Sequence, residues 1–244
     1  MWGIPRTPPD FMKGEFSMVK IYSAIQMMFI SVALTAIGSV ISNIESLSGL
    51  GSIMSIVGGI MTIAALYRLR HENSHFSKAI RLFWIYMGLT LLLVILAAAM
   101  LVSIVSDEGY NSAALVWAIA LLVMAVIVLI LALAMQYQLY SGFEELRALR
   151  NLDYPPKRIM WCFYLALISM IVSVISISGI TALVISSAAG GDTALTAAAH
   201  TIDMAGNIML VFGTMMEAIH LWLIFTFMQS AKAALENETP EGWS

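Results

Sequence analysis

The residues best placed for chemistry are Glu217 and His220, three positions apart within a long apolar segment near the C-terminus. This spacing is close to one helical turn, so both side chains project from one face of a helix. Ionisable groups deep in a membrane are costly and usually mark function. A carboxylate beside an imidazole can relay a proton or bind a cation. We therefore predict a proton- or cation-responsive intramembrane pair; the alternative is a neutral Glu217 that fixes helix packing through a hydrogen bond.

A second candidate is the segment 71–75, HENSH, which has the H-E-x-x-H spacing and so resembles the motif of membrane zinc proteases. On a helix this spacing places two imidazoles on one face as zinc ligands, here His71 and His75, with Glu72 as the general base. The flanking residues are typical of a solvated loop, and a third ligand must come from elsewhere in the chain. A zinc metalloprotease is the third of our functional interpretations.

Small and hydroxyl-bearing residues recur at helical spacing in three apolar segments. Small residues four apart allow close helix approach, and we assign this role to Gly51, Ser55 and Gly59 in the second segment. Hydroxyl-bearing faces on the first and fifth segments could instead line a path for water or ions around Glu217. These polar faces comprise Ser31, Thr35, Gly38 and Ser42 in the first segment and Ser169, Ser173 and Ser176 in the fifth.

The composition requires a membrane around these residues. Of 244 residues, 60% are hydrophobic and only 11% are charged, whereas a soluble domain has about 45–50% apolar and about 25% charged residues. A helix needs about 20 mostly apolar residues to cross a bilayer. Six segments qualify, namely 20–43, 47–67, 81–105, 113–137, 158–187 and 205–230. The predicted fold is an all-α, polytopic transmembrane bundle of six helices arranged as three hairpins.

The positions of the basic residues predict the orientation. All 12 Lys and Arg lie before the first segment, around the second and fourth connections, or after the sixth segment. Because short cytoplasmic loops carry the excess of basic residues, both termini are expected in the cytoplasm. Residues 1–19 are an N-terminal arm that can lie on the lipid headgroups, 20–230 the transmembrane domain and 231–244 a polar tail. We expect a multi-pass protein of the plasma (inner) membrane.

No strong motif names a reaction. The chain contains no phosphate-binding loop, dinucleotide glycine pattern or C-x-x-C, so no cofactor is implied and an enzyme is not the favoured interpretation. Its positive charge lies along membrane rims, which argues against a nucleic-acid partner. The leading hypothesis is a transport or channel-like protein, working as a homo-oligomer or with other membrane subunits. The alternative is a non-catalytic scaffold subunit of a membrane complex, in which the Glu217–His220 pair is structural.

Overall fold

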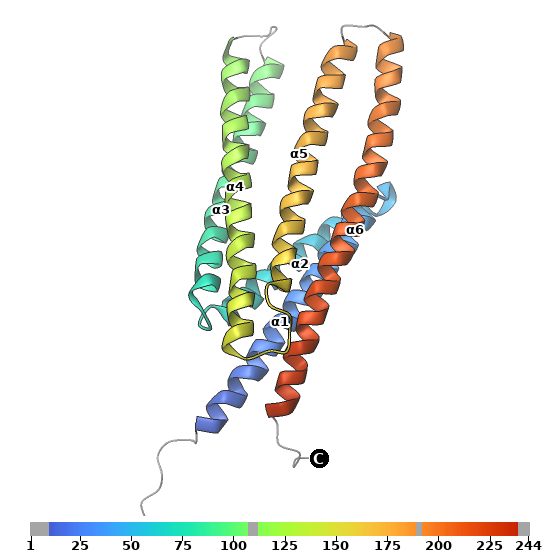
Figure 1. Cartoon of the computed structure of the whole chain (residues 1–244). Helices are drawn as coiled ribbons and strands as arrows, with labels where there is room; N and C mark the ends of the chain where they lie inside the picture. The colour runs from blue at the N-terminus through green and yellow to red at the C-terminus, as the bar shows by residue number, and fades with distance from the viewer. Residues whose placement is uncertain (1–9, 107–111, 189–191, 239–244) are drawn as a thin grey trace, which may run out of the picture.

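A computed structural model describes residues 10–106, 112–188 and 192–238 of the chain. These residues form six α-helices and two short 3-10 turns, and they contain no strand. The prediction of an all-α bundle is confirmed (Figure 1). The elements are α1 (Asp10–Ser42), η1 (Glu45–Leu47), α2 (Ser48–Leu69), α3 (Ser74–Ser106), α4 (Ser112–Leu149), η2 (Arg158–Met160), α5 (Trp161–Ala188) and α6 (Asp192–Glu238).

Five helices contain a described segment that is long and apolar enough to cross a membrane. The described part of α5 contributes a shorter apolar segment, Arg158–Val172. An apolar surface of this extent is stable only in lipid, so the chain is a multi-pass integral membrane protein. The five long segments are Met18–Ser42, Ser48–Leu69, Ser74–Ala99, Ala120–Leu149 and Gly206–Asn237.

Four helices extend beyond the apolar segments that predicted them. Helix α3 begins at Ser74 rather than 81, and α1 begins at Asp10 rather than 20, so residues 10–19 of the predicted N-terminal arm are helical. Helix α4 continues to Leu149 rather than ending at 137, because its last turns are amphipathic and carry an Arg147–Glu144 ion pair at 2.9 Å. Helix α6 begins at Asp192 rather than 205, through a stretch rich in alanine, the residue with the highest helix propensity. It also runs to Glu238, so the first part of the predicted tail is helical.

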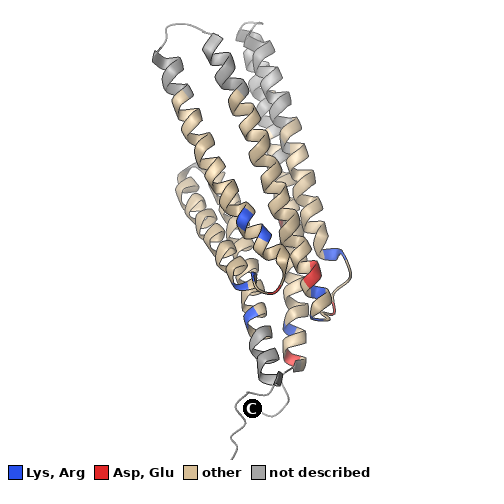
Figure 2. Cartoon of the chain, turned by 90° about the vertical axis from the view of Figure 1, so that its left-hand side faces the viewer, with Lys and Arg blue, Asp and Glu red and all other residues tan. Residues whose placement is uncertain are grey.

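The helices pack as consecutive hairpins, α1 with α2, α3 with α4 and α5 with α6, and α1 also packs along α6. In Figure 1 the α1–α2 hairpin crosses behind α5 and α6 at an angle. The start of α1 and the end of α6 lie at the same end of the bundle. We call this the basic end, because the Lys and Arg of the described chain gather toward it (Figure 2).

The buried core is concentrated toward the basic end. Met18, Leu69, Phe76, Leu146 and Ala231, from five different helices, are each fully buried there. Further along the bundle, the α3–α4 and α5–α6 hairpins leave large apolar side chains exposed, as expected of a surface that faces lipid. Examples are Leu91, Val94, Leu122, Ile130 and Ile175.

Candidate functional site: a polar cavity between four helices

The site begins where the backbones of α1 and α2 come into contact. A Cβ atom added to Gly51 would lie 2.5 Å from the carbonyl oxygen of Gly38, and one added to Gly58 would lie 2.5 Å from Thr35 Oγ1 and 2.8 Å from the Ser31 carbonyl oxygen. Glycine is therefore required at both positions for the two helices to approach this closely. The approach brings a hydroxyl-bearing face of α1 directly against α2.

The predicted packing stripe needs one correction. A Cβ atom on Gly59 would meet nothing within 4 Å, so Gly58 rather than Gly59 continues the contact face of Gly51 and Ser55. With 3.6 residues per turn, seven residues complete almost two turns, whereas eight rotate the side chain away from the partner helix. Spacing of four was thus the wrong period for the third position.

A hydroxyl network bridges the two helices at this contact. Ser31, which is 1% exposed, donates from Oγ to the Gly58 carbonyl oxygen at 2.6 Å and also shares a hydrogen bond with the Thr62 hydroxyl. The Thr35 hydroxyl donates to the Ser31 carbonyl oxygen at 3.0 Å. These bonds satisfy polar groups that would otherwise be costly away from water.

Beside this network lies a cavity of about 210 Å³. It is bounded by four helices and includes side chains from inside four of the long apolar segments. We call it the polar cavity, because hydroxyl, amide, carboxyl and imidazole groups share its wall. Its lining residues are Met28, Ser31, Val32, Thr35, Ala36, Thr62, Gln136, Leu139, Tyr140, Glu217 and His220.

Tyr140 holds His220 in position. The Tyr140 hydroxyl and His220 Nε2 are 2.5 Å apart, and the two rings meet edge to face with centroids 5.7 Å apart. Tyr140 is 2% exposed and packs against Phe143, which in turn contacts Phe227. The imidazole is therefore fixed by α4 and keeps a face toward the cavity.

Glu217 takes a different partner. Its carboxyl group interacts with the side chain of Ser39 of α1. Among the described residues, no Lys or Arg forms an ion pair with it. Glu217 and His220 thus line one cavity, as their shared helix face requires, but each is oriented by a separate neighbour. A third polar atom, Gln136 Oε1, is buried and has no hydrogen-bond partner in the described part of the chain.

A second hollow adjoins the first through Glu217. It is an open groove of about 250 Å³ between α1 and α6, which we call the lateral groove. The lining has two polar side chains, Thr214 and Glu217. The Thr214 hydroxyl donates to the Leu210 carbonyl oxygen at 2.8 Å, and Glu217 is the ionisable group of the lining. Its lining residues are Ala36, Ile37, Val40, Ile41, Thr214, Glu217, Ala218 and Leu221.

The HENSH segment does not form a helical pair of zinc ligands. Helix α2 ends at Leu69 and α3 begins at Ser74, so a turn separates His71 from His75. His71 Nε2 accepts a hydrogen bond from Arg70 at 2.8 Å, and His75 Nδ1 is 2.7 Å from Gln138 Oε1.

Glu72, the general base of that interpretation, instead pairs with Arg150 at 2.9 Å. No group of three or more His, Cys, Asp or Glu side chains in the described ranges is arranged to hold a metal ion. The geometry of segment 71–75 therefore gives the metalloprotease interpretation no support.

The predicted contribution of the fifth helix also differs. Ser169 is half-buried on α5 and lines neither the polar cavity nor the lateral groove, while the side chains of Ser173 and Ser176 lie outside the described residues. On α1, Ser31 and Thr35 do line the cavity, whereas Gly38 and Ser42 serve the contact with α2. The helices that complete the cavity are α2 and α4, whereas α5 packs on α6 without contacting α1 in the described part of the chain.

Sequence reasoning missed Gln136, Tyr140 and Thr62. Gln136 and Tyr140 are four residues apart and so share a face of α4, and an amide beside an apolar run is a detectable signal. Tyr140 lies beyond position 137, the predicted end of that apolar segment, and so was not predicted to be inside the membrane.

Comparison of the chain with protein-family models, with curated proteins and with solved structures finds no match. The chemistry of the cavity is therefore inferred from its own residues.

Proposed function

We propose that this chain is a membrane transport protein in which the polar cavity carries protons or small cations and Glu217 is the ion-binding carboxylate. The observation that carries the proposal is the position of Glu217: it lines a polar cavity inside four apolar segments, with a hydroxyl but no described basic side chain as partner.

An acid in that position has two stable states. A carboxylate away from water is costly unless it is protonated or neutralised by a bound cation. Exchange between these states is the step that an ion carrier needs. The cavity also supplies oxygen ligands of the kind that hard cations prefer, among them the hydroxyl of Thr35 and the unpartnered Oε1 of Gln136.

The Tyr140–His220 pair adds a second group able to exchange protons in the same cavity. Imidazole is the side chain best suited to proton exchange near neutral pH. Because Tyr140 occupies Nε2, the ring is held in one orientation while it borders the cavity that Glu217 shares. The pair is thus positioned to pass a proton to or from the cavity.

The proposal extends to the surroundings of the bundle. The distribution of basic residues supports a cytoplasmic basic end in the plasma membrane. The exposed apolar faces of the α3–α4 and α5–α6 hairpins are available to other copies of the chain or other membrane subunits as well as to lipid.

The test is proton flux into liposomes that contain the purified protein and an internal pH-sensitive dye, driven by an imposed membrane potential. Glu217→Gln should lower the flux by about a hundredfold, the scale of a positioned proton-transfer group. Glu236→Gln is the matched control, since Glu236 lies on the same helix with its side chain 64% exposed. Equal flux in folded Glu217→Gln protein would overturn the proposal. If the wild-type protein carries no ion, the proposal is also wrong and the scaffold interpretation is favoured.

A further inference from the structure

We propose that the lateral groove admits small hydrophobic organic cations from the lipid to Glu217. This inference rests on the transport function proposed above and names a substrate class for the same carboxylate. The observation behind it is that Glu217 borders two hollows of opposite character, the polar cavity and the lateral groove.

The walls of the lateral groove select for apolar material. Ile37, Val40 and Ile41 of α1 face Ala218 and Leu221 of α6 across it. A hydrated inorganic ion gains nothing from such walls and would lose its water along them. An apolar group leaves lipid for these walls at little cost, because the two environments are alike.

Charge decides which apolar molecule fits. The Glu217 carboxyl, the ionisable group of the lining, has a hydroxyl partner in Ser39 but no described basic side chain to neutralise it. An anion is repelled by a carboxylate, and a neutral apolar molecule leaves its charge uncompensated. A molecule with an apolar body and one positive charge satisfies both the walls and the carboxylate.

Size restricts the class further. The groove measures about 250 Å³, which is below the range of about 300–1,000 Å³ that holds drug-sized ligands. The matching ligand therefore carries one ring or a short alkyl body beside its ammonium group. Because the groove is open, entry from the bilayer requires no separation of α1 from α6.

The experiment measures binding of radiolabelled phenyltrimethylammonium to the full chain in phosphatidylcholine nanodiscs, with empty nanodiscs as the blank. Saturable binding is expected for the wild-type protein, and Glu217→Gln should weaken it by about tenfold or more. Ala218→Phe, which fills the groove, should weaken it to a similar extent. The matched control is Ile219→Phe, the next residue on α6, which is 41% exposed and lines neither hollow; its affinity should stay within about twofold of wild type.

Further arms make each outcome decisive. Val40→Trp fills the groove from α1 and replaces Ala218→Phe if that variant does not fold. Competition by uncharged tert-butylbenzene as strong as by unlabelled phenyltrimethylammonium would overturn the role of charge. Equal binding of the probe by the groove-filling variants and by Ile219→Phe would overturn the groove as the binding site. If only added lipids with an amine headgroup displace the probe, the groove binds lipid rather than a small organic cation, and the inference is wrong. Glu217-dependent proton flux without probe binding would overturn this inference and leave the proposed function standing, whereas flux independent of Glu217 overturns the proposed function.

Discussion

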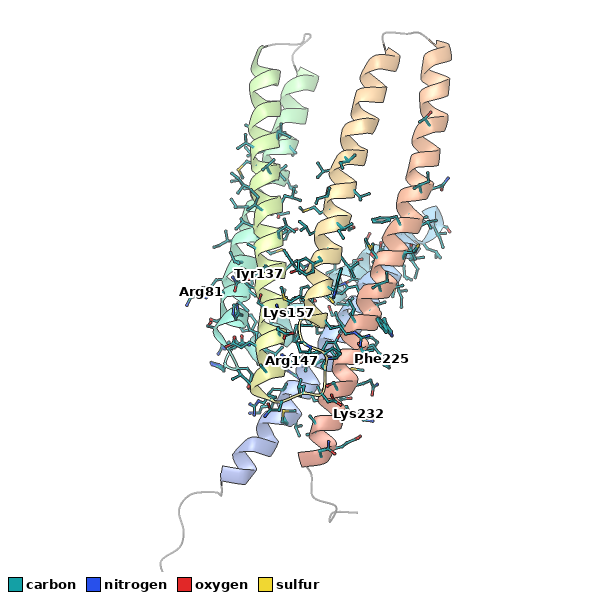
Figure 3. The ribbon with its side chains drawn as sticks, viewed as in Figure 1. Arg81, Tyr137, Arg147, Lys157, Phe225 and Lys232 are labelled. Atoms are coloured by element: carbon teal, nitrogen blue, oxygen red, sulfur yellow. The ribbon has the colours of Figure 1, made fainter. Side chains whose placement is uncertain are left out.

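Two polar clusters of the molecule differ in whether their carboxylates have basic partners. At the basic end, Glu72 pairs with Arg150 and Glu144 pairs with Arg147, each at 2.9 Å. Glu144 also accepts a hydrogen bond from the Lys157 backbone amide at 3.0 Å. Figure 3 labels Arg147 and Lys157 where α4 meets the loop that leads to α5. We call Glu72, Glu144, Arg147, Arg150 and Lys157 the basic-end cluster.

The second cluster lies inside the apolar segments and contains one carboxylate with no described basic partner. Its members are Ser31, Thr62, Gln136, Tyr140, Glu217 and His220, which we call the intramembrane cluster. Ion pairs at an aqueous edge form at small cost and are worth little, so the basic-end cluster needs no function beyond joining the turn between α2 and α3 to the end of α4 and the 150–160 loop. An unneutralised acid within the membrane costs several kcal/mol. This cost, which the ion-paired carboxylates of the basic end do not carry, is the reason for associating function with Glu217.

The first prediction concerns the helix packing that holds the intramembrane cluster together in the absence of ion pairs. Gly58→Leu forces α2 away from α1, because its Cβ atom would already lie 2.5 Å from Thr35 Oγ1. We expect a loss of about 3 kcal/mol in the free energy of unfolding, the upper part of the usual range for overpacking. Gly59→Leu is the control, since its Cβ atom meets nothing within 4 Å. Steric trapping in bicelles measures both, and equal losses would contradict the assigned contact face.

The choice between these two glycines also shows where sequence reasoning ends. Six helices follow from the length of apolar runs, and Glu217 and His220 stand out because no other strongly ionisable residue lies so deep in an apolar segment. Which neighbours they meet depends on helix order and rotation, which no local pattern encodes. Tyr140 reaches His220 from 80 positions away, and the choice of Gly58 over Gly59 is set by the rotation of α2 against α1.

The second prediction tests whether the intramembrane cluster acts as a unit. Tyr140→Phe keeps the ring packing but removes the hydroxyl that holds His220 Nε2 at 2.5 Å. Loss of a buried hydrogen bond of about 1.4 kcal/mol corresponds to about a tenfold fall in proton flux in the liposome assay. Tyr137→Phe is the matched control from the same helix, because Tyr137 is 46% exposed and packs its ring against Phe163. If neither Tyr140→Phe nor Tyr137→Phe changes the proton flux, His220 has a packing role only.

The third prediction tests the structural role of the basic-end cluster. Arg150→Ala removes the partner of Glu72 in a pair whose side chains are 27% and 21% exposed. We expect a loss of about 1 kcal/mol in stability that shrinks at high salt, with proton flux per folded molecule unchanged. A double-mutant cycle with Glu72→Gln isolates the pair energy. A flux defect larger than the stability loss would give this cluster a functional role and erase the contrast with Glu217.

The smallest effect is expected at Tyr154, in the 150–160 loop, which packs against α6. Its hydroxyl donates to the Leu223 carbonyl oxygen at 3.2 Å, and the side chain is 5% exposed. Burial raises the pKa of Tyr154 above its ordinary value of 10.0, against smaller opposing effects from the Thr226 hydrogen bond and the Arg158 charge. The neutral phenol is thus favoured more in the folded than in the unfolded chain.

The stabilisation by Tyr154 is consequently complete below the unfolded-state pKa of about 10, and it is lost as the pH rises through the higher folded-state value. Between about pH 9 and about pH 11, the unfolding temperature of the wild-type protein should fall further than that of Tyr154→Phe, which has no proton to lose. Tyr164→Phe removes a tyrosine that is 45% exposed, so its unfolding temperature should fall as much as that of the wild-type protein over this pH range. If Tyr154→Phe falls as steeply as wild type, the alkaline loss arises from other groups, and the loop is attached to α6 by packing of its rings rather than by the buried hydroxyl.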